Sequence, residues 1–319
     1  MVPPGLALAT PPLVLAAALA IDRLVGDPHS RIHPVALIGR FIGLWGRPSC
    51  YPSSLQRAAG VFFWICTVLL FTLPFVLFSL LAPWYLYLLC APLLLKCCFA
   101  WRSLEEHAYA VAEAVNRGLE PGREAVRMLV SRNTAALDEE HILSAAYESL
   151  TENITDSIVS PFLFYGILGL FGAALYRAAN TMDAMLGYRD ERELLGWCSA
   201  RMDDILNYIP ARVTLLCLLT YFAAQGRFSN AVTILRRDGR NRPGYNGGIV
   251  MAAMAGGVGI RFEKPGVYTI GDPEHALKEA GPAVIKAVRW VTLMAAVLAA
   301  ILACTTLFLL GSWINNIGI

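Results

Sequence analysis

Charged residues are scarce in this chain. They make up only 16% of its 319 residues, whereas soluble domains carry about 25%. Hydrophobic residues reach 56%, and the mean hydropathy is +0.53. This balance predicts a membrane protein, so we expect a lipid bilayer as a partner. The formal net charge is only +2, which excludes the strongly basic surface typical of nucleic-acid binding.

Two common signatures of chemistry are also missing. The eight cysteines form no CxxC pair, which argues against a zinc site or a disulfide framework. We interpret them as small buried hydrophobes in a reducing compartment. The sequence contains no GxxxxGK[ST] motif, so the protein is not a P-loop NTPase.

Positive charge is absent from three long stretches. Residues 1–22, 58–95 and 290–319 contain neither lysine nor arginine, and all 26 such residues lie between Arg23 and Arg289. Because positive charge collects on the cytoplasmic side of a membrane, the three stretches are expected to cross it or reach its far side. We expect a multi-pass protein of the cytoplasmic membrane whose active face is cytoplasmic.

The predicted fold is all-α, a polytopic helical membrane protein that forms a single membrane-embedded domain over residues 1–319. A helix needs about 20 apolar residues to cross the hydrocarbon core. Four full spans are expected, at residues 5–25, 59–80, 84–100 and 288–311. The intervening cytoplasmic segments, with amphipathic helices and loops, are residues 26–57, 101–156, 176–208 and 226–287. Helical spacing after Trp101 predicts an amphipathic helix that stops at Gly118, and another helix begins near Asp138.

Two further apolar stretches, about 157–175 and 209–225, are expected to be embedded. If each crossed fully, arginine-bearing segments would fall outside, which the charge rule disfavours. Either both helices return to the same face, or they cross as a pair with 177–208 outside. We favour the re-entrant arrangement because it keeps every polar motif on one side.

The segment ESLTENITDS carries an unusual acidic face. Glu148, Glu152 and Asp156 are spaced i, i+4, i+8, so on a helix they share one side. Carboxylates at this spacing repel by roughly 0.2–0.5 kcal/mol per pair. The face therefore predicts a compensating cation, either a metal ion or an arginine, and it is the first place to look for chemistry in so apolar a chain.

Several ordered motifs resemble one family. They are DxxxGDPxxxxHP, ESLTEN-x2-DS, ANTMDAMLGY, ARMDDILNYIPAR and NGG-x2-MAAMAG. Together they are similar to the CbiB/CobD family of cobalamin biosynthesis, the membrane-bound adenosylcobinamide-phosphate synthases. The resemblance runs from about Asp22 to Gly271. The chain departs from the family at Asn133, where an aspartate is usual, and at Gly244-Tyr245, where Ser-Pro is usual.

The resemblance implies an ATP-dependent ligase that forms an amide. ATP would activate a carboxylate of adenosylcobyric acid as an acyl phosphate. The amine of (R)-1-aminopropan-2-ol, or of its O-phosphate, would then attack. Magnesium would neutralise the meeting anions, held by one or two protein carboxylates and by phosphate oxygens and water.

The resemblance also implies roles for particular residues. Glu148, Glu152 and Asp156 are the first candidates for catalysis and for holding the metal. A second acidic set comprises Asp183, Asp203 and Asp204. The arginines expected to clamp phosphate are Arg132, Arg177, Arg201 and Arg212. The remaining substrate or nucleotide contacts are Asp22, Asp27, Asn153, Asn180, Asn246 and Gly248, and the proton acceptor for the amine is His33.

Three alternatives stay open. In the first, the acids and arginines simply pair with one another, as Asp204 with Arg212 or Glu152 with Arg177. A transporter would line a pathway with such residues, although no convincing internal repeat is found and the polar motifs gather at span ends. A non-catalytic corrinoid-binding scaffold is the third. The oligomeric state, including a homo-oligomer, is open as well.

Overall fold

The structure is a computed structural model that describes residues 8–27, 33–130 and 132–317, with side chains to residue 309. Its contacts divide the chain into two compact units. Unit 1 comprises Met1–Ala100, Ser160–Leu206 and Ala296–Ile319. Unit 2 comprises Trp101–Val159 and Asn207–Ala295. That all residues share a single membrane-embedded domain remains a prediction.

Long apolar helices confirm the all-α membrane class. By length and composition, three stretches of described helix could span a bilayer, namely Ser53–Leu81, Glu139–Leu186 and Leu277–Leu309, of which the second is broken at Gly169. The bent pair Trp197–Leu206 and Tyr208–Ala224 raises the number to four if it counts as one span.

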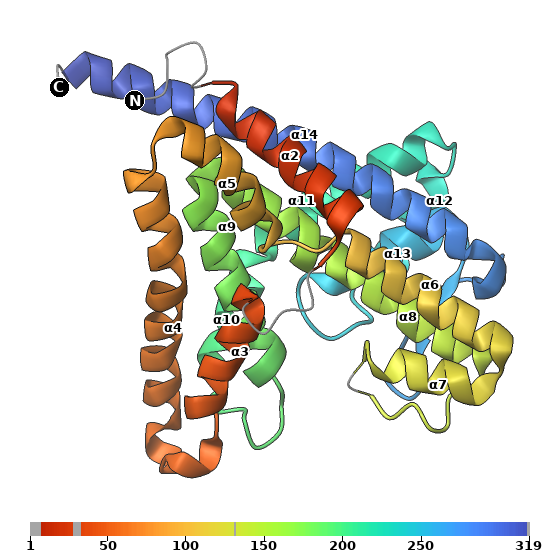
Figure 1. Cartoon of the computed structure of the whole chain (residues 1–319). Helices are drawn as coiled ribbons and strands as arrows, with labels where there is room; N and C mark the ends of the chain where they lie inside the picture. Colours follow the sequence, from red (N-terminus) through yellow and green to blue (C-terminus); the bar gives the residue numbers. More distant parts are fainter. Residues whose placement is uncertain (1–7, 28–32, 131, 318–319) are drawn as a thin grey trace. The chain divides into compact units, whose positions relative to one another are not determined.

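In unit 1, α9 packs against α3, α4 and α10 (Figure 1). Its helices are α2 (Thr10–Val25), α3 (Pro34–Trp45), the short η1 (Pro48–Cys50), α4 (Ser53–Leu81), α5 (Trp84–Lys96), α9 (Ser160–Leu186) and α10 (Trp197–Leu206), with the end of α14. A buried cluster on α3, α4 and α9 forms the core, and Trp45 stacks on Phe63 with ring centroids 5.1 Å apart.

Two of the expected spans coincide with shorter helices. α2 has 16 residues and α5 has 13. At about 1.5 Å per residue, they measure about 24 and 20 Å, less than the roughly 30 Å of the hydrocarbon core. α5 ends at Lys96, a buried lysine that two aspartates neutralise. The expected spans at 59–80 and 288–311 lie within the longer α4 and α14.

The helix α9 folds back on itself at Gly169, which has φ +64° and ψ −151°. Phe164 and Tyr176 lie on opposite sides of this break, and their rings stack with centroids 5.4 Å apart. In a straight helix twelve residues would separate them by about 18 Å along the axis. A Cβ on Gly172 would lie 2.1 Å from the carbonyl oxygen of Phe164. The segment therefore forms a close-packed helical hairpin, the shape of a re-entrant segment, and the membrane face to which it opens remains a prediction.

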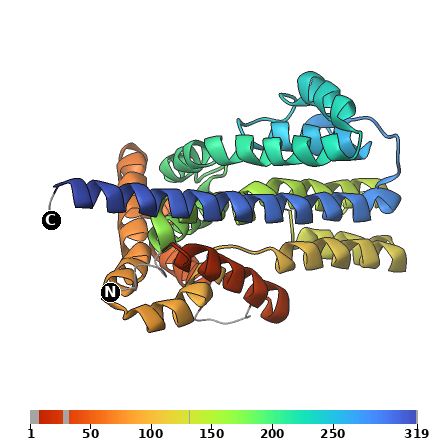
Figure 2. The same cartoon turned by 90° about the horizontal axis from the view of Figure 1, so that it is seen from above.

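Unit 2 packs several amphipathic and buried helices around α8 (Figure 2). Its elements are α6 (Arg102–Arg117), α7 (Leu119–Arg127), α8 (Glu139–Ile154), the π-helix η2 (Thr155–Val159), α11 (Tyr208–Ala224), α12 (Phe228–Asp238), α13 (Gly247–Val258), β1 (Arg261–Lys264), β2 (Tyr268–Gly271) and the first part of α14 (Leu277–Ile317). Gly118, with φ +141°, ends α6 as predicted. Asp138 caps α8, because its side chain accepts a 2.9 Å hydrogen bond from the His141 amide.

The glycine-rich segment after residue 226 is more ordered than its composition indicates. It folds into α12, α13 and an antiparallel β1–β2 hairpin instead of a long loop. α13 is apolar all round and almost wholly buried, which favours a packed helix. The hairpin pairs Lys264 with Tyr268 and packs against α8. Asp238 ties α12 to this hairpin by accepting a 2.8 Å hydrogen bond from the Gly271 amide.

Candidate functional site

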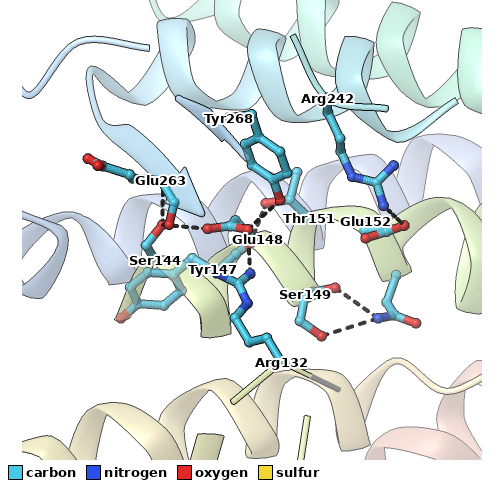
Figure 3. Close-up of polar contacts among 11 residues, drawn as sticks. Arg132, Ser144, Tyr147, Glu148, Ser149, Thr151, Glu152, Arg242, Glu263 and Tyr268 are labelled. Atoms are coloured by element: carbon cyan, nitrogen blue, oxygen red, sulfur yellow. Dashed lines mark hydrogen bonds and ion pairs between the residues drawn. The ribbon is translucent and has the colours of Figure 1, made fainter. Parts of the chain in front are cut away.

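The carboxylate of Glu148 is buried on α8 and accepts hydrogen bonds from three side chains (Figure 3). Arg132 and Tyr268 each donate to Oε2 at 2.6 Å, and Ser144 donates to Oε1 at 2.6 Å. Ser144 also accepts a 2.8 Å hydrogen bond from the Glu263 amide, which anchors β1 to α8. Burial and the negative charge of Glu148 raise the pKa of Tyr268, so its phenol stays protonated and donates.

Glu152 lies one turn further along α8 and has a different environment. Its Oε1 pairs with Arg242, from the loop between α12 and α13. The side chain of Glu152 is 38% exposed, whereas that of Glu148 is 3% exposed. Burial works against the charge on Arg242, but Glu152, Tyr268 and Asp156 together raise its pKa. Two arginines from separate segments therefore pair with the acidic face, as one of the two predicted kinds of cation.

Asp156 lies where the α-helix gives way to the π-helix of Thr155–Val159. Single π-turns inside helices occur frequently at functional sites. Asn153, immediately before this turn, donates a 2.9 Å hydrogen bond to the Ser149 carbonyl and accepts one from Ser157. The amide of Asn153 is thus used within its own helix in this structure.

The start of α13 carries two more of the predicted residues, Asn246 just before the helix and Gly248 within it. Arg212 donates a 2.7 Å hydrogen bond to Oδ1 of Asn246. Gly248 is required by packing, since a Cβ there would lie 2.6 Å from the carbonyl oxygen of Gly239. At the family departures, Gly244 has φ +109°, which favours glycine, and the side chain of Asn133 accepts a local hydrogen bond from the Ala135 amide.

Magnesium fits one of these carboxylates better than the other. In the part of the chain that the structure describes, no three His, Cys, Asp or Glu side chains gather to hold a metal on their own. Magnesium needs only one or two carboxylates when phosphate and water complete its shell. Glu148 would have to lose hydrogen bonds to serve, whereas Glu152 is partly exposed. Metal binding by Glu148, Glu152 and Asp156 remains a prediction.

Unit 1 contains a second polar cluster, centred on Lys96 at the end of α5. Its ammonium lies 3.0 Å from Oδ1 of Asp22 and also pairs with Asp27. Lys96 is 4% exposed and Asp22 is fully buried. A lysine so buried requires a carboxylate partner, so these aspartates of the DxxxGDP motif hold the ends of α2 and α5 together.

A cavity of about 200 Å³ lies beside this cluster, lined by Asp27, His33, Arg177, Val35, Cys97, Phe99 and Ala100. His33 caps α3 by accepting a hydrogen bond from the Val35 amide at Nδ1. Its Nε2, like Nε of Arg177, is buried and has no hydrogen-bond partner among the described residues. Burial lowers the pKa of His33, Asp27 opposes this, and Arg177 and Lys96 reinforce it. His33 is therefore neutral at pH 7.

The other predicted residues of unit 1 lie on α9 and α10. Asn180 donates a 3.3 Å hydrogen bond to Asp203, which joins the two helices. Arg201 lies 3.9 Å from Asp204 on the same helix, and their side chains are 55% and 37% exposed. Asp183 packs at the end of α9, where a Cβ on Gly187 would meet its carboxylate.

Glu152 pairs with Arg242, and Asp204 lies 3.9 Å from Arg201. The suggested pairs Glu152–Arg177 and Asp204–Arg212 would each join residues of different units, and they remain predictions. Three side chains of these clusters were not among the site residues predicted from the sequence, namely Arg242, Tyr268 and Lys96. Lys96 had a signal in the sequence, because it is a lone charge at the end of an apolar run.

Known proteins provide the context for this geometry. Residues 15–294 match the family described as CobD/Cbib protein. A relative from Methanothermobacter thermautotrophicus, named "Probable cobalamin biosynthesis protein CobD", is 42% identical over 262 residues, which are 82% of this chain and 86% of that protein. The chain belongs to the CobD/CbiB family.

Two further family members bear the same name. The protein from Thermococcus kodakarensis is 43% identical over 255 residues, 79% of this chain and 82% of its own length. The protein from Methanococcus vannielii is 35% identical over 280 residues, 84% of this chain and 90% of its own length. No solved structure matches the chain. The CobD/CbiB match spans both units, so both polar clusters lie within it.

Proposed function

We propose that this protein acts in cobalamin biosynthesis as an adenosylcobinamide-phosphate synthase. It would join (R)-1-aminopropan-2-ol, or its O-phosphate, to adenosylcobyric acid with ATP and Mg²⁺. The names of the relatives support the pathway. The observation that carries the chemistry is the face of α8, where two neighbouring carboxylates meet two arginines and a tyrosine.

In the proposed reaction a carboxylate oxygen of the corrinoid attacks the γ-phosphorus of ATP, and ADP leaves. The amine nitrogen then attacks the acyl carbon, phosphate leaves, and the nitrogen loses a proton. Both partners of the first step are anions, so the protein must supply positive charge. Bound magnesium would supply part of it, with Glu152 as its most accessible α8 ligand.

Arginine side chains of unit 2 would bind the phosphates. Nη1 of Arg132 is buried and has no hydrogen-bond partner among the described residues, so it retains a donor for an anion. Arg212, on α11, donates a hydrogen bond to Asn246, the residue that precedes α13, and helix N-termini favour phosphate. Guanidinium pairs with phosphate through two parallel hydrogen bonds, which would orient the γ-phosphoryl group.

The cavity of unit 1 has the size and polarity for a small amine. Asp27 offers a carboxylate for an ammonium group, and Arg177 offers a cation for a phosphate or hydroxyl. We assign His33 as the acceptor of the amine proton, because it is neutral at pH 7 and its Nε2 has no hydrogen-bond partner among the described residues. The active face would lie on the cytoplasmic side of the cytoplasmic membrane.

The direct test is a reconstituted assay. Purified protein in lipid receives adenosylcobyric acid, amine, ATP and Mg²⁺, and the amide product and ADP are followed together. The proposal expects both products, each dependent on the amine or its phosphate. Transport of corrinoid across sealed vesicles without amide formation would replace the proposal with a transporter.

A further inference from the structure

Glu148 and Glu152 are neighbours on α8, but their arginine partners differ in how easily they can be exchanged. Glu148 is 3% exposed, and Arg132, Tyr268 and Ser144 all donate to it. Removing one partner from so buried an ion leaves an uncompensated charge. Glu152 is 38% exposed and pairs with Arg242. Water can replace a lost partner there, so this pair is the one that can open.

Arg242 is also well placed to reach another anion. It comes from the loop between α12 and α13, and it contacts α8 through Glu152 (Figure 3). Its guanidinium interacts electrostatically with Tyr268 and Asp156 as well. Gly247 leaves it room, since a Cβ there would lie 2.7 Å from Nη1 of Arg242. The Arg242 side chain therefore lies against the same polar face that carries both α8 carboxylates.

The chemistry of the two partners suits an exchange. A guanidinium binds phosphate as readily as carboxylate, with the same fork geometry. A carboxylate paired with arginine is a poor magnesium ligand until the arginine leaves it. A nucleotide phosphate that captured the arginine would therefore free the carboxylate for the metal that accompanies the nucleotide.

We propose that Arg242 exchanges partners during turnover, pairing with Glu152 before nucleotide binds and with a nucleotide phosphate afterwards, so that Glu152 becomes a magnesium ligand. This inference rests on the proposed function and adds to it a phosphate-binding residue. Nucleotide and magnesium then bind cooperatively. The phosphate draws Arg242 away from Glu152, and the magnesium ion draws Glu152 away from Arg242.

The test compares KM for ATP in the reconstituted ligase among several variants. Arg242→Gln should raise KM for ATP at least about tenfold, the scale of a lost charge-assisted hydrogen bond, and leave KM for adenosylcobyric acid unchanged. Arg242→Lys should raise KM for ATP by a smaller factor than Arg242→Gln, since lysine keeps the charge but not the planar, two-pronged geometry of the guanidinium. The matched control is Arg227→Gln, which breaks the comparable Arg227–Glu274 pair of 2.7 Å in the same unit and should leave both KM values unchanged.

A charge swap distinguishes an Arg242–Glu152 pair that exchanges partners from one that only stabilises the fold. The double variant Arg242→Glu/Glu152→Arg can restore an ion pair and the thermal stability lost in Arg242→Gln, but it should stay inactive because the two groups have changed places. Recovery of activity in the swap, or an unchanged KM for ATP in Arg242→Gln, would overturn the inference while the proposed function stood. A wild-type protein without ATP-dependent ligation would refute the proposed function itself.

Discussion

The phenol of Tyr268 donates a 2.6 Å hydrogen bond to Oε2 of Glu148, which lies 120 residues earlier in the chain. The β1–β2 hairpin brings the tyrosine there, and the Glu263 amide fixes the same hairpin to Ser144. A buried carboxylate is stable only when its lone pairs are satisfied. The hairpin therefore supplies a hydrogen-bond donor to the buried carboxylate of Glu148 in unit 2.

Replacing Tyr268 by phenylalanine should destabilise the protein. The change removes one donor from a buried carboxylate, which costs about 1–3 kcal/mol. Thermal unfolding in detergent should therefore show a lower midpoint for Tyr268→Phe. Tyr245→Phe is the control, because that side chain is 64% exposed, and it should unfold like the wild type. Equal midpoints for the two variants would show that the hydrogen bond to Glu148 contributes nothing.

The fold-back of α9 should depend on glycine at position 169. Its backbone lies in a region that only glycine adopts without strain, so Gly169→Ala should cost about 1–3 kcal/mol of stability. Space is not the cause, because a Cβ at Gly169 meets nothing within 4 Å. Gly43→Ala is a matched control, since that helical glycine has equal room but no positive φ. Equal midpoints of thermal unfolding for the two alanine variants would contradict the hairpin.

The pH profile of kcat should have an acid limb, a loss of activity at low pH, that is set by protonation of His33. Its pKa is lowered from 6.5 by burial, so it loses its role as proton acceptor only below that value. The kcat of the ligase should fall as pH drops through this lowered pKa. His33→Gln should reduce kcat by about 10²–10⁴-fold, the contribution of a general base, and remove the acid limb. His107→Gln, at an exposed position, should keep it, and an identical limb in His33→Gln would exclude this histidine.

The same shift predicts the direction of a stability change. A histidine with a depressed pKa in the folded state binds fewer protons than in the unfolded state. The stability that neutral His33 contributes is therefore fully present above pH 6.5 and is lost as pH falls through its lowered folded pKa. Unfolding midpoints of wild type and His33→Gln should converge or cross on acidification. A parallel pH dependence would contradict the burial of a neutral imidazole.

The topology can be tested by labelling single cysteines from each side of sealed vesicles. Residues 130–155, 178–205 and 236–250 lie within three of the predicted cytoplasmic segments. Glu139, Glu191 and Arg240 provide one exposed position in each of these ranges. With the exposed Cys50 replaced by serine, a cysteine at each of the three should react only from the cytoplasmic side. Labelling at position 191 from the outside would defeat the re-entrant arrangement and support the paired crossing.

Local patterns predicted much of the helical framework. The apolar run of α4, the stop at Gly118 and the start of α8 near Asp138 all follow from residue types within one or two turns. The need for cations on the acidic face was also predicted, because the spacing of Glu148 and Glu152 is a local property of a helix.

The partners on that face could not be read from the sequence. Arg242 lies 90 residues from Glu152 and Tyr268 lies 120 from Glu148, so only tertiary packing brings them together. The β1–β2 hairpin could not be predicted, because it lies in a glycine-rich polar segment without alternation of apolar residues. Gly169 lies between Gly166 and Gly172 at equal spacing, and such spacing of small residues indicates close helix packing without revealing a turn.

The central claim is that the α8 carboxylates and their arginines support ATP-dependent amide formation. Its most direct measurement is amine-dependent ADP release with adenosylcobyric acid and Mg²⁺, comparing wild type with Glu152→Gln and with Glu274→Gln, whose exposed ion pair lies outside the site. The account predicts amide and ADP in equal amounts from wild type and Glu274→Gln, and none from folded Glu152→Gln. Near-normal turnover by Glu152→Gln would contradict it.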